Sequence, residues 1–164
     1  MWISSSMNSR PHRGAAFVEF ALVLPLLLLL VFGITELGRA LYQLNTLTRA
    51  TDAGVRHLSR SWAVLDADCQ PGANWASATQ ATSSFVVFGN HSQSGQPLLP
   101  GMTVADVSIS ASSELVSGLN EAACVIRIDT RATFNAVLGD QVVPFTNLGP
   151  ITLRAGKEGR YLGQ

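Results

Sequence analysis

An unbroken apolar run lies near the start of the chain. Every residue from Phe20 to Ile34 is apolar, glycine or proline, and the run extends back to Ala15 with Glu19 as its one charged residue. About 20 helical residues extend about 30 Å, which is the thickness of the hydrocarbon core of a bilayer. The run therefore predicts a transmembrane helix over residues 15–36. Pro25 is compatible with this prediction because spanning helices tolerate proline.

A helical stripe follows this run with no proline to interrupt it. Residues recur at alternating spacings of four and three: Leu37, Leu41, Leu44, Thr48, Thr51, Val55, Leu58 and Trp62. This period predicts that the helix continues to about residue 60, as an extracytoplasmic extension over 37–62. One face of it would dock the domain that follows, and another would pack against partner helices. The stripe weakens at Thr48 and Thr51, which predicts less burial there.

The remaining residues, 63–164, predict a small α+β domain that begins with a loop and a second helix. The loop over 66–74 contains proline and glycine, and Asn74 is a candidate N-cap for a helix that ends at Gly89. The expected apolar face of this helix consists of Trp75, Ala78, Ala81 or Thr82, Phe85 and Phe88. An exposed connection over 90–101 follows.

Three later segments alternate apolar and polar residues with a period of two. They are 107–111, 124–131 and 151–155, and each predicts a half-buried strand. We expect a turn at 118–120 and a longer loop over 135–150. The predicted fold is therefore α+β: a long N-terminal transmembrane helix that continues into a small domain with a second helix and a short antiparallel sheet.

Charge indicates the orientation of the span. The chain has a net charge of zero, but Arg10, His12 and Arg13 precede the apolar run. The positive-inside rule then predicts a cytoplasmic N-terminus and an outward-facing domain. Residues 1–14 would be a cytoplasmic leader, starting at Met1 or at Met7. No basic stripe or set of stacking aromatic residues is present, so we expect no nucleic-acid partner.

Few residues suggest catalysis or metal binding. His57 and His91 are isolated and lack ligand spacing, so we expect both to be surface residues. Neither a Gly-x-Ser-x-Gly turn nor a phosphate-binding glycine loop occurs. The acids Asp66 and Asp68 lie in a loop in which carboxylates are usually solvated. We therefore expect a protein that is not an enzyme and that uses no metal or cofactor.

The two cysteines are Cys69 and Cys124. Outside the cytoplasm they would meet an oxidising environment, in which a disulfide closing a loop of about 55 residues adds about 4 kcal/mol in the chain-entropy model. Two unpaired buried thiols are the alternative, and the sequence leaves this choice open.

Glu19 stands out because a carboxylate at the centre of a bilayer costs roughly 2.5–3.5 kcal/mol. Gly14 lies five residues upstream. Cleavage after Gly14 would give Ala15 a free ammonium group that could meet Glu19 of a neighbouring copy. The alternative is that Glu19 is an interfacial acid at the end of a plain anchor helix.

The segment Arg13–Phe20, the apolar residues up to Pro25 and the segment Glu36–Ala40 resemble the N-terminus of TadE/TadF-like proteins. These are pseudopilin-like components of the tight-adherence pilus system, which is related to type IV pili. The family pattern is a glycine, four residues, and a glutamate followed by phenylalanine or tyrosine. Gly14, Glu19 and Phe20 match it. The resemblance is strong over residues 13–60 and weaker beyond them.

The resemblance implies a minor pseudopilin in the bacterial inner membrane, with a periplasmic domain. A prepilin peptidase would cut between Gly14 and Ala15, and Glu19 and Phe20 would act in subunit assembly. The implied partners are this peptidase, other pilins or pseudopilins, inner-membrane pilus platform proteins and the lipid bilayer. A competing interpretation is a signal-anchored periplasmic binding or interaction domain that no prepilin peptidase processes.

Overall fold

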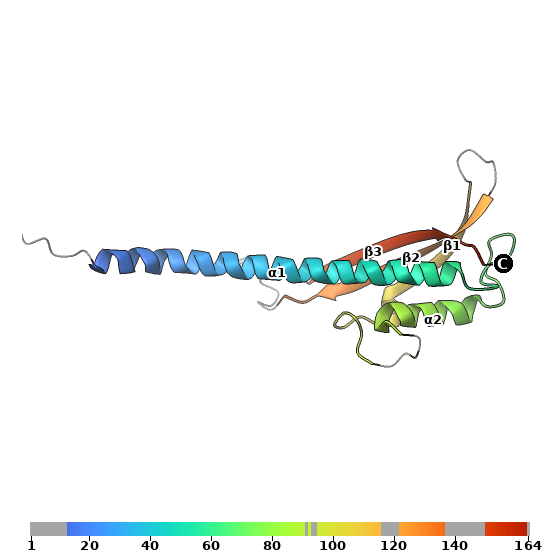
Figure 1. The fold of residues 1–164 in the computed structure, drawn as a ribbon, viewed down its shortest axis with the longest axis horizontal. Coiled ribbons are helices and arrows are strands. Elements are labelled where there is room, and N and C mark those ends of the chain that lie inside the picture. Colours follow the sequence, from blue (N-terminus) through green and yellow to red (C-terminus); the bar gives the residue numbers. More distant parts are fainter. Residues whose placement is uncertain (1–12, 91, 93–94, 116–121, 137–149, 164) are drawn as a thin grey trace, which may run out of the picture. The chain divides into compact units, whose positions relative to one another are not determined.

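The structure, a computed structural model, describes residues 13–90, 92, 95–115, 122–136 and 150–163. It contains the elements α1 (Arg13–Ser59), α2 (Trp75–Phe88), the 3-10 turn η1 (Val104–Asp106), β1 (Val107–Leu115), β2 (Ala122–Phe134) and β3 (Ile151–Arg160). Figure 1 labels the two α-helices and the strands. The chain separates into two compact units, Met1–Leu37 and Gly38–Gln164, and α1 contributes to both. The predicted α+β class is confirmed.

The first unit consists, in its described part, of the N-terminal portion of α1. The helix runs through Pro25 without a break. Every side chain from Gly14 to Thr35 is exposed, and none of the most apolar 18-residue window is buried within the protein. By length and composition α1 is suited to cross a membrane, which agrees with a single-pass anchor.

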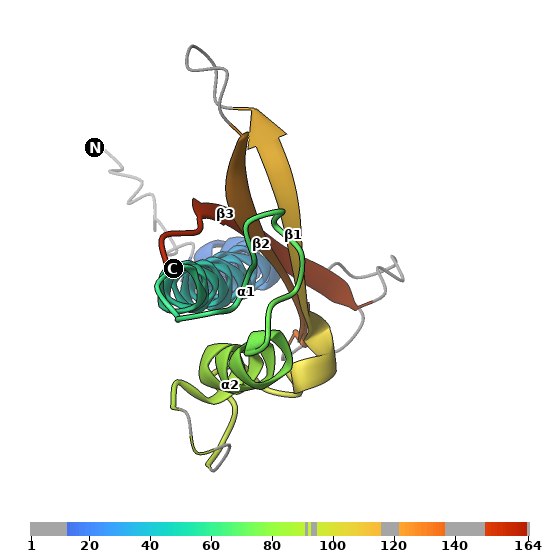
Figure 2. The same cartoon turned by 90° about the vertical axis from the view of Figure 1, so that its right-hand side faces the viewer.

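The second unit contains a three-stranded antiparallel sheet in the order β1-β2-β3. Ile109 of β1 lies opposite Ile128 of β2, which in turn lies opposite Lys157 of β3. The second half of α1 lies beside α2 on one face of the sheet, as Figure 2 shows. The three predicted strands are confirmed, and each is longer than its apolar pattern indicated. The expected turn at 118–120 and most of the loop 135–150 lie outside the described residues.

Two apolar clusters form the core between the helices and the sheet. One contains Leu47, Val86, Val87, Leu99, Met102 and Ala132, and the other contains Val55, Leu58, Val64, Leu65, Ile126 and Ile128. The residues of β2 that face the helices therefore pack against α1 and α2, and also against the segments that follow each helix. Leu99 is 3% exposed, although the connection over 90–101 is predicted to be exposed. It is buried because this connection turns back onto the core.

The part of α1 after residue 37 follows its predicted stripe only in part. Val55 and Leu58 are buried, but Leu41 and Trp62 are exposed. The prediction of weaker burial at Thr51 is wrong, since Thr51 is fully buried. Its hydroxyl lies 2.8 Å from the carbonyl oxygen of Leu47 and 2.8 Å from the hydroxyl of Thr130 on β2. These hydrogen bonds satisfy the polar group and permit its burial.

Helix α2 has the predicted bounds, and Thr82 of its predicted face is buried, but the rest of its buried face differs. Its buried residues are Thr82, Ser84, Val86 and Val87, whereas Trp75, Ala78, Phe85 and Phe88 are only partly buried. The close approach of α1 accounts for this, because a Cβ atom at Gly54 would lie 2.5 Å from Cγ2 of Val86. Asn74 occupies the N-cap position, yet its side chain makes no cap and donates to the carbonyl oxygen of Trp62. Gly89 ends α2 with a φ of 70°.

Candidate functional site

The segment that carries the family pattern lies at the start of α1. Gly14 and Ala15 are in the first turn of the helix, and both are exposed. A Cβ atom at Gly14 would meet nothing within 4 Å. The first four amides of a helix have no acceptor within it, so the first turn opens more readily than the turns that follow. The peptide bond between Gly14 and Ala15 is thus sterically open and lies where few hydrogen bonds hold the backbone.

Glu19 and Phe20 lie one turn further along the same helix. Both side chains are exposed, and Phe20 is the first residue of the uninterrupted apolar run. Glu19 is on the same face of α1 as Ala15, about 6 Å further along the axis. Within the described part of the chain, Glu19 forms no ion pair. Its carboxylate is therefore available to a group from another molecule.

Cys69 and Cys124 are joined by a disulfide across 55 residues, with their Cα atoms 5.2 Å apart. The loop that presents Cys69 is shaped by Asp66, whose carboxylate accepts hydrogen bonds from the backbone amides of Asp68, at 3.0 Å, and Gln70, at 2.8 Å. The disulfide fastens this loop, which follows α1, to β2. Asp66 has a structural role here, and within the described residues no three potential ligands gather into a metal site.

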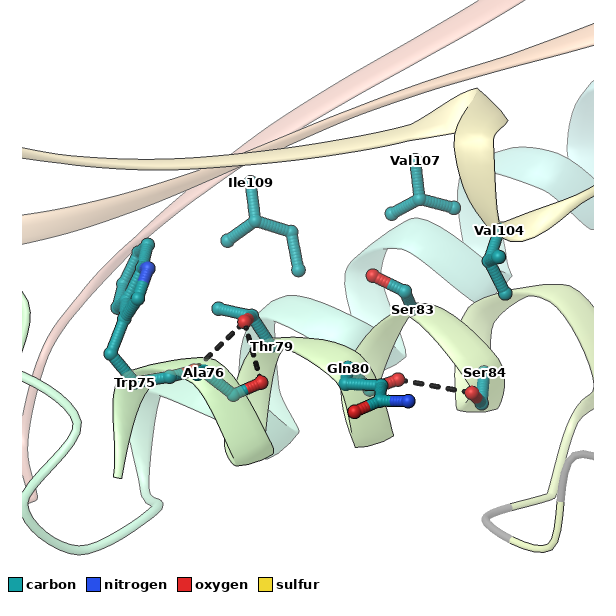
Figure 3. Close-up of a pocket in the computed structure, with 9 residues that line it drawn as sticks. All are labelled: Trp75, Ala76, Thr79, Gln80, Ser83, Ser84, Val104, Val107 and Ile109. Carbon is teal, nitrogen blue, oxygen red and sulfur yellow. Dashed lines mark hydrogen bonds between the residues drawn. The ribbon is translucent and has the colours of Figure 1, made fainter. Parts of the chain in front are cut away.

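A hollow of about 380 Å³ lies between α2 and β1. Figure 3 shows Val107 and Ile109 pointing from β1 toward α2, with Trp75 and Val104 at the two ends of the hollow. The other residues lining it are Ala76, Thr79, Gln80, Ser83 and Ser84. The hydroxyls of Thr79 and Ser84 donate to carbonyl oxygens of α2, and none of the described lining residues is ionisable. The hollow could hold an uncharged group but offers no acid or base for catalysis.

The face of the sheet away from the helices carries a group of charges. Arg127 contacts Asp129 at 2.7 Å through Nε and also pairs with Glu158 across the strands. The hydrogen bond and charge of Asp129, together with the charge of Glu158, raise the pKa of Arg127. The group is exposed to solvent, and its charges pair with one another. This is typical of a cross-strand charge network rather than of a reactive site.

The interface between α1 and α2 contains His57, which is predicted from the sequence to be a surface residue. It is partly buried, and its Nδ1 lies 3.1 Å from the hydroxyl of Thr82 while its ring packs 5.9 Å from that of Phe85. His57 thus joins α1 to α2, which corrects the expectation. His91 lies outside the described residues.

Tyr161 is a structural residue that the sequence pattern did not single out. Its hydroxyl donates to the carbonyl oxygen of Ser61 and accepts from the amide of Val64, each at 3.0 Å. The amide of Leu162 also donates to the carbonyl oxygen of Ser59, at 2.8 Å. These bonds hold the chain after β3 against the end of α1. This role depends on contacts between segments about 100 residues apart, which a local sequence pattern does not predict.

Comparison with known proteins identifies the N-terminal segment. Residues 14–56 match a family model described as TadE-like protein. The match begins at Gly14, includes Glu19 and Phe20, and ends in the last turn of α1. No curated protein and no solved structure gives a significant match. The resemblance noted in the sequence is confirmed over this range: residues 14–56 of the chain form a TadE-like segment.

Proposed function

We propose that this protein is a TadE-like minor pseudopilin that takes part in assembling a tight-adherence pilus or a related secretion apparatus. The observation that carries the proposal is the TadE-like match over 14–56, which begins at Gly14 and coincides with most of α1. The uncovered apolar surface of this helix supports it, because such a surface needs lipid or other helices around it. The role is structural and requires no catalytic group or cofactor.

The proposed maturation step is hydrolysis of the bond between Gly14 and Ala15 by a prepilin peptidase. Water adds to the carbonyl carbon of Gly14, which leaves a carboxylate on Gly14 and an ammonium group on Ala15. The leader, residues 1–14, is released on the cytoplasmic side of the bacterial inner membrane. The absence of a side chain at Gly14 gives a close-fitting active site access to the backbone.

Glu19 then has a partner in assembly. Its carboxylate pairs with the Ala15 ammonium group of a neighbouring pilin or pseudopilin, within the apolar region of packed helices. In a low dielectric such a pair is favourable only when both charges are present and well placed. The pairing therefore fixes the axial register of adjacent helices. Platform proteins of the inner membrane would supply further helix contacts, and the domain would face the periplasm.

The mature N-terminus tests the maturation step. Mass spectrometry of the protein, expressed with an active prepilin peptidase, should give a chain that starts at Ala15. Gly14→Leu should block cleavage because its side chain fills the open approach to the backbone, whereas Gly33→Leu should not, although Gly33 is equally open on the same helix. A wild-type chain that still starts at Met1 or Met7 would contradict the proposal.

Substitution of Glu19 tests the assembly step. Glu19→Gln should leave membrane insertion intact and lower pilus number at least about tenfold, because breaking a buried pair costs roughly 3–5 kcal/mol. Glu19→Asp keeps the charge on a shorter side chain and should retain more assembly than Glu19→Gln. Pili can be counted by electron microscopy of sheared preparations. Equal numbers in the wild type and Glu19→Gln would remove the role given to Glu19.

The second candidate is a signal-anchored periplasmic binding domain. The uncharged hollow between α2 and β1 favours it, since that hollow could receive a small uncharged ligand or a peptide side chain. This function needs neither cleavage after Gly14 nor a charge at Glu19. An unprocessed chain that is unaffected by Glu19→Gln would therefore favour the second candidate over the first.

A further inference from the structure

The second unit has two ends that can be defined along α1. At one, the Phe134 end, the Arg39 guanidinium lies 5.7 Å from the ring centroid of Phe134. At the other, the disulfide end, α1 stops at Ser59 and the loop containing Cys69 is bonded to β2. Within this unit α1 and β3 run from the Phe134 end to the disulfide end, as Figure 1 shows.

Two arginines lie directly opposite each other near the Phe134 end. Arg131 of β2 and Arg154 of β3 are cross-strand partners, both exposed on the sheet face away from the helices. They line a shallow hollow of about 320 Å³ together with Ser108, Asp129 and Gly156. Like charges at directly opposite positions destabilise a sheet. The carboxylate of Asp129 pairs with Arg127, and no ion pair of the described residues joins it to Arg131 or Arg154.

Two carboxylates lie at the disulfide end. Asp68 precedes Cys69, which is bonded to Cys124, and Glu114 lies opposite Ala123, the residue before Cys124. Both are exposed, and within the described residues neither forms an ion pair. Arg60 and Arg160 are at the same end, but no pair joins them to these acids. Asp68 and Glu114 are therefore available to cations from another molecule.

We propose that Arg131 and Arg154 of one copy bind Asp68 and Glu114 of a second copy of this chain. The inference rests on the proposed function, in which all copies enter the membrane with one polarity and keep that polarity in the assembly. An arginine pair cannot bind a second arginine pair, so the contact must join unlike ends, which makes it heterologous. Guanidinium groups bind carboxylates through paired hydrogen bonds, and the hollow gives an incoming acid access to both arginines.

The register of the sheet sets the expected offset between copies. Arg131 and Cys124 are seven residues apart on β2, a span of about 23 Å. The second copy would be displaced by a comparable distance along the strand direction. The contact thus joins copies that are further apart along the axis than those joined by the Glu19–Ala15 pair, whose offset is about 6 Å. Its arginine side lies on the face of the sheet away from α1 and α2.

Charge reversal and its compensation test this contact in the full-length chain, expressed with its peptidase and platform proteins. Arg131→Glu with Arg154→Glu should lower the amount of assembled protein at least tenfold, and so should Asp68→Arg with Glu114→Arg. The four changes together should restore assembly. Lys157→Glu is the matched control, because Lys157 is exposed on the same strand as Arg154 but belongs to the other face of the sheet. It should leave assembly unchanged.

A zero-length crosslink tests the contact directly. A carbodiimide should join the amine introduced by Arg154→Lys to Asp68 or Glu114 of another copy, detected between isotope-labelled and unlabelled chains by mass spectrometry. A link to a different protein would overturn the assignment of a second copy. Arg154→Gln should not lower the melting temperature, because it removes a like-charge contact, and a clear drop would overturn the view that the pair is free for a partner.

The outcomes separate this inference from the proposed function. If the wild type is cleaved after Gly14 and assembles, while the arginine reversal assembles equally well, the axial contact is wrong and the function stands. If the wild type is neither cleaved nor assembled, the proposed function fails, whatever the crosslinks show.

Discussion

Thr51 and Thr130 place two hydroxyl groups in the core of the domain. Both residues are at most 1% exposed, and their oxygens lie 2.8 Å apart between α1 and β2. Thr51 is also in contact with the carbonyl oxygen of Leu47, and Thr130 with that of Ala155. The two hydroxyl groups and the two carbonyl oxygens thus form a short hydrogen-bonded chain between α1 and the sheet. This polar contact orients α1 over the sheet without burying a charge.

The free-energy costs of substituting the two members of this pair should be less than additive. Thr51→Val leaves the Thr130 hydroxyl with one fewer partner, and we expect a loss of about 1 kcal/mol in the free energy of unfolding. Thr51→Val with Thr130→Val should cost less than the sum of the single changes, because no unpaired hydroxyl remains. Chemical denaturation of the chain in detergent measures both. Strict additivity would show that the hydroxyls are not coupled.

Residue-scale burial is the part of the fold that hydropathy predicted least well. Thr51 and Ser84 are buried because each hydroxyl is in contact with a carbonyl oxygen one turn earlier in its own helix, at Leu47 and Gln80. A hydropathy pattern treats them as polar and does not register the bond. By contrast, the cleavage-site candidate Gly14 and the assembly candidate Glu19 depend on local spacing, which can be read directly from the sequence.

At the scale of elements, the disulfide connects the loop after α1 to the central strand. Cys69 is buried, and its partner Cys124 lies on β2 between the two edge strands. The loop also forms a bridge between Leu65 and Pro71. The end of α1 is therefore tied to the sheet by a covalent bond as well as by the packing of Leu58.

Removing this bond should destabilise the domain strongly. In the chain-entropy model a disulfide that spans about 55 residues contributes about 4 kcal/mol, so Cys69→Ser with Cys124→Ser should lower the melting temperature by well over 10 °C. Thermal melts followed by near-UV circular dichroism, with and without reductant, measure this. Reductant should affect the wild type and leave the double variant unchanged. A wild type indifferent to reductant would argue against the bond.

The elements themselves were largely predictable because their periods are strong. The alternation at 107–111, 124–131 and 151–155 matches β1, β2 and β3, and the predicted end of α1 near residue 60 agrees with Ser59. The cross-strand register was not predictable, since it depends on segments far apart in the chain. The opposition of Arg131 and Arg154 follows from that register alone, so it was visible only in the structure.

At the scale of the whole molecule, one helix serves two units with different surroundings. Its first part presents apolar side chains outward from Phe17 onward, and its second part contributes Leu47, Val55 and Leu58 to a conventional core. The same element is thus suited to lipid at one end and to protein at the other. Hydropathy differs between the two parts of the helix in the same way, since it is uniform in the first part and periodic in the second.

The protein should consequently behave as an integral membrane protein. It should remain with membranes washed in alkaline carbonate and be released by detergent. Leu27→Arg with Leu28→Arg should reduce this retention, because each charge costs roughly 2.5–3.5 kcal/mol at mid-bilayer. Leu41→Arg alters a similarly exposed leucine outside residues 15–36 and should leave retention unchanged. Immunoblots of the fractions measure it, and full release by carbonate would contradict the prediction.

The placement of the arginine pair and the two free carboxylates at opposite ends of the domain has a consequence for polymer length. The arginine pair of each added copy would cover the carboxylates of the previous copy, and its own carboxylates would stay exposed for the next copy. The contact itself therefore does not limit the number of copies. Growth would then be limited by the supply of subunits or by a terminating protein that lacks one of the two charged ends.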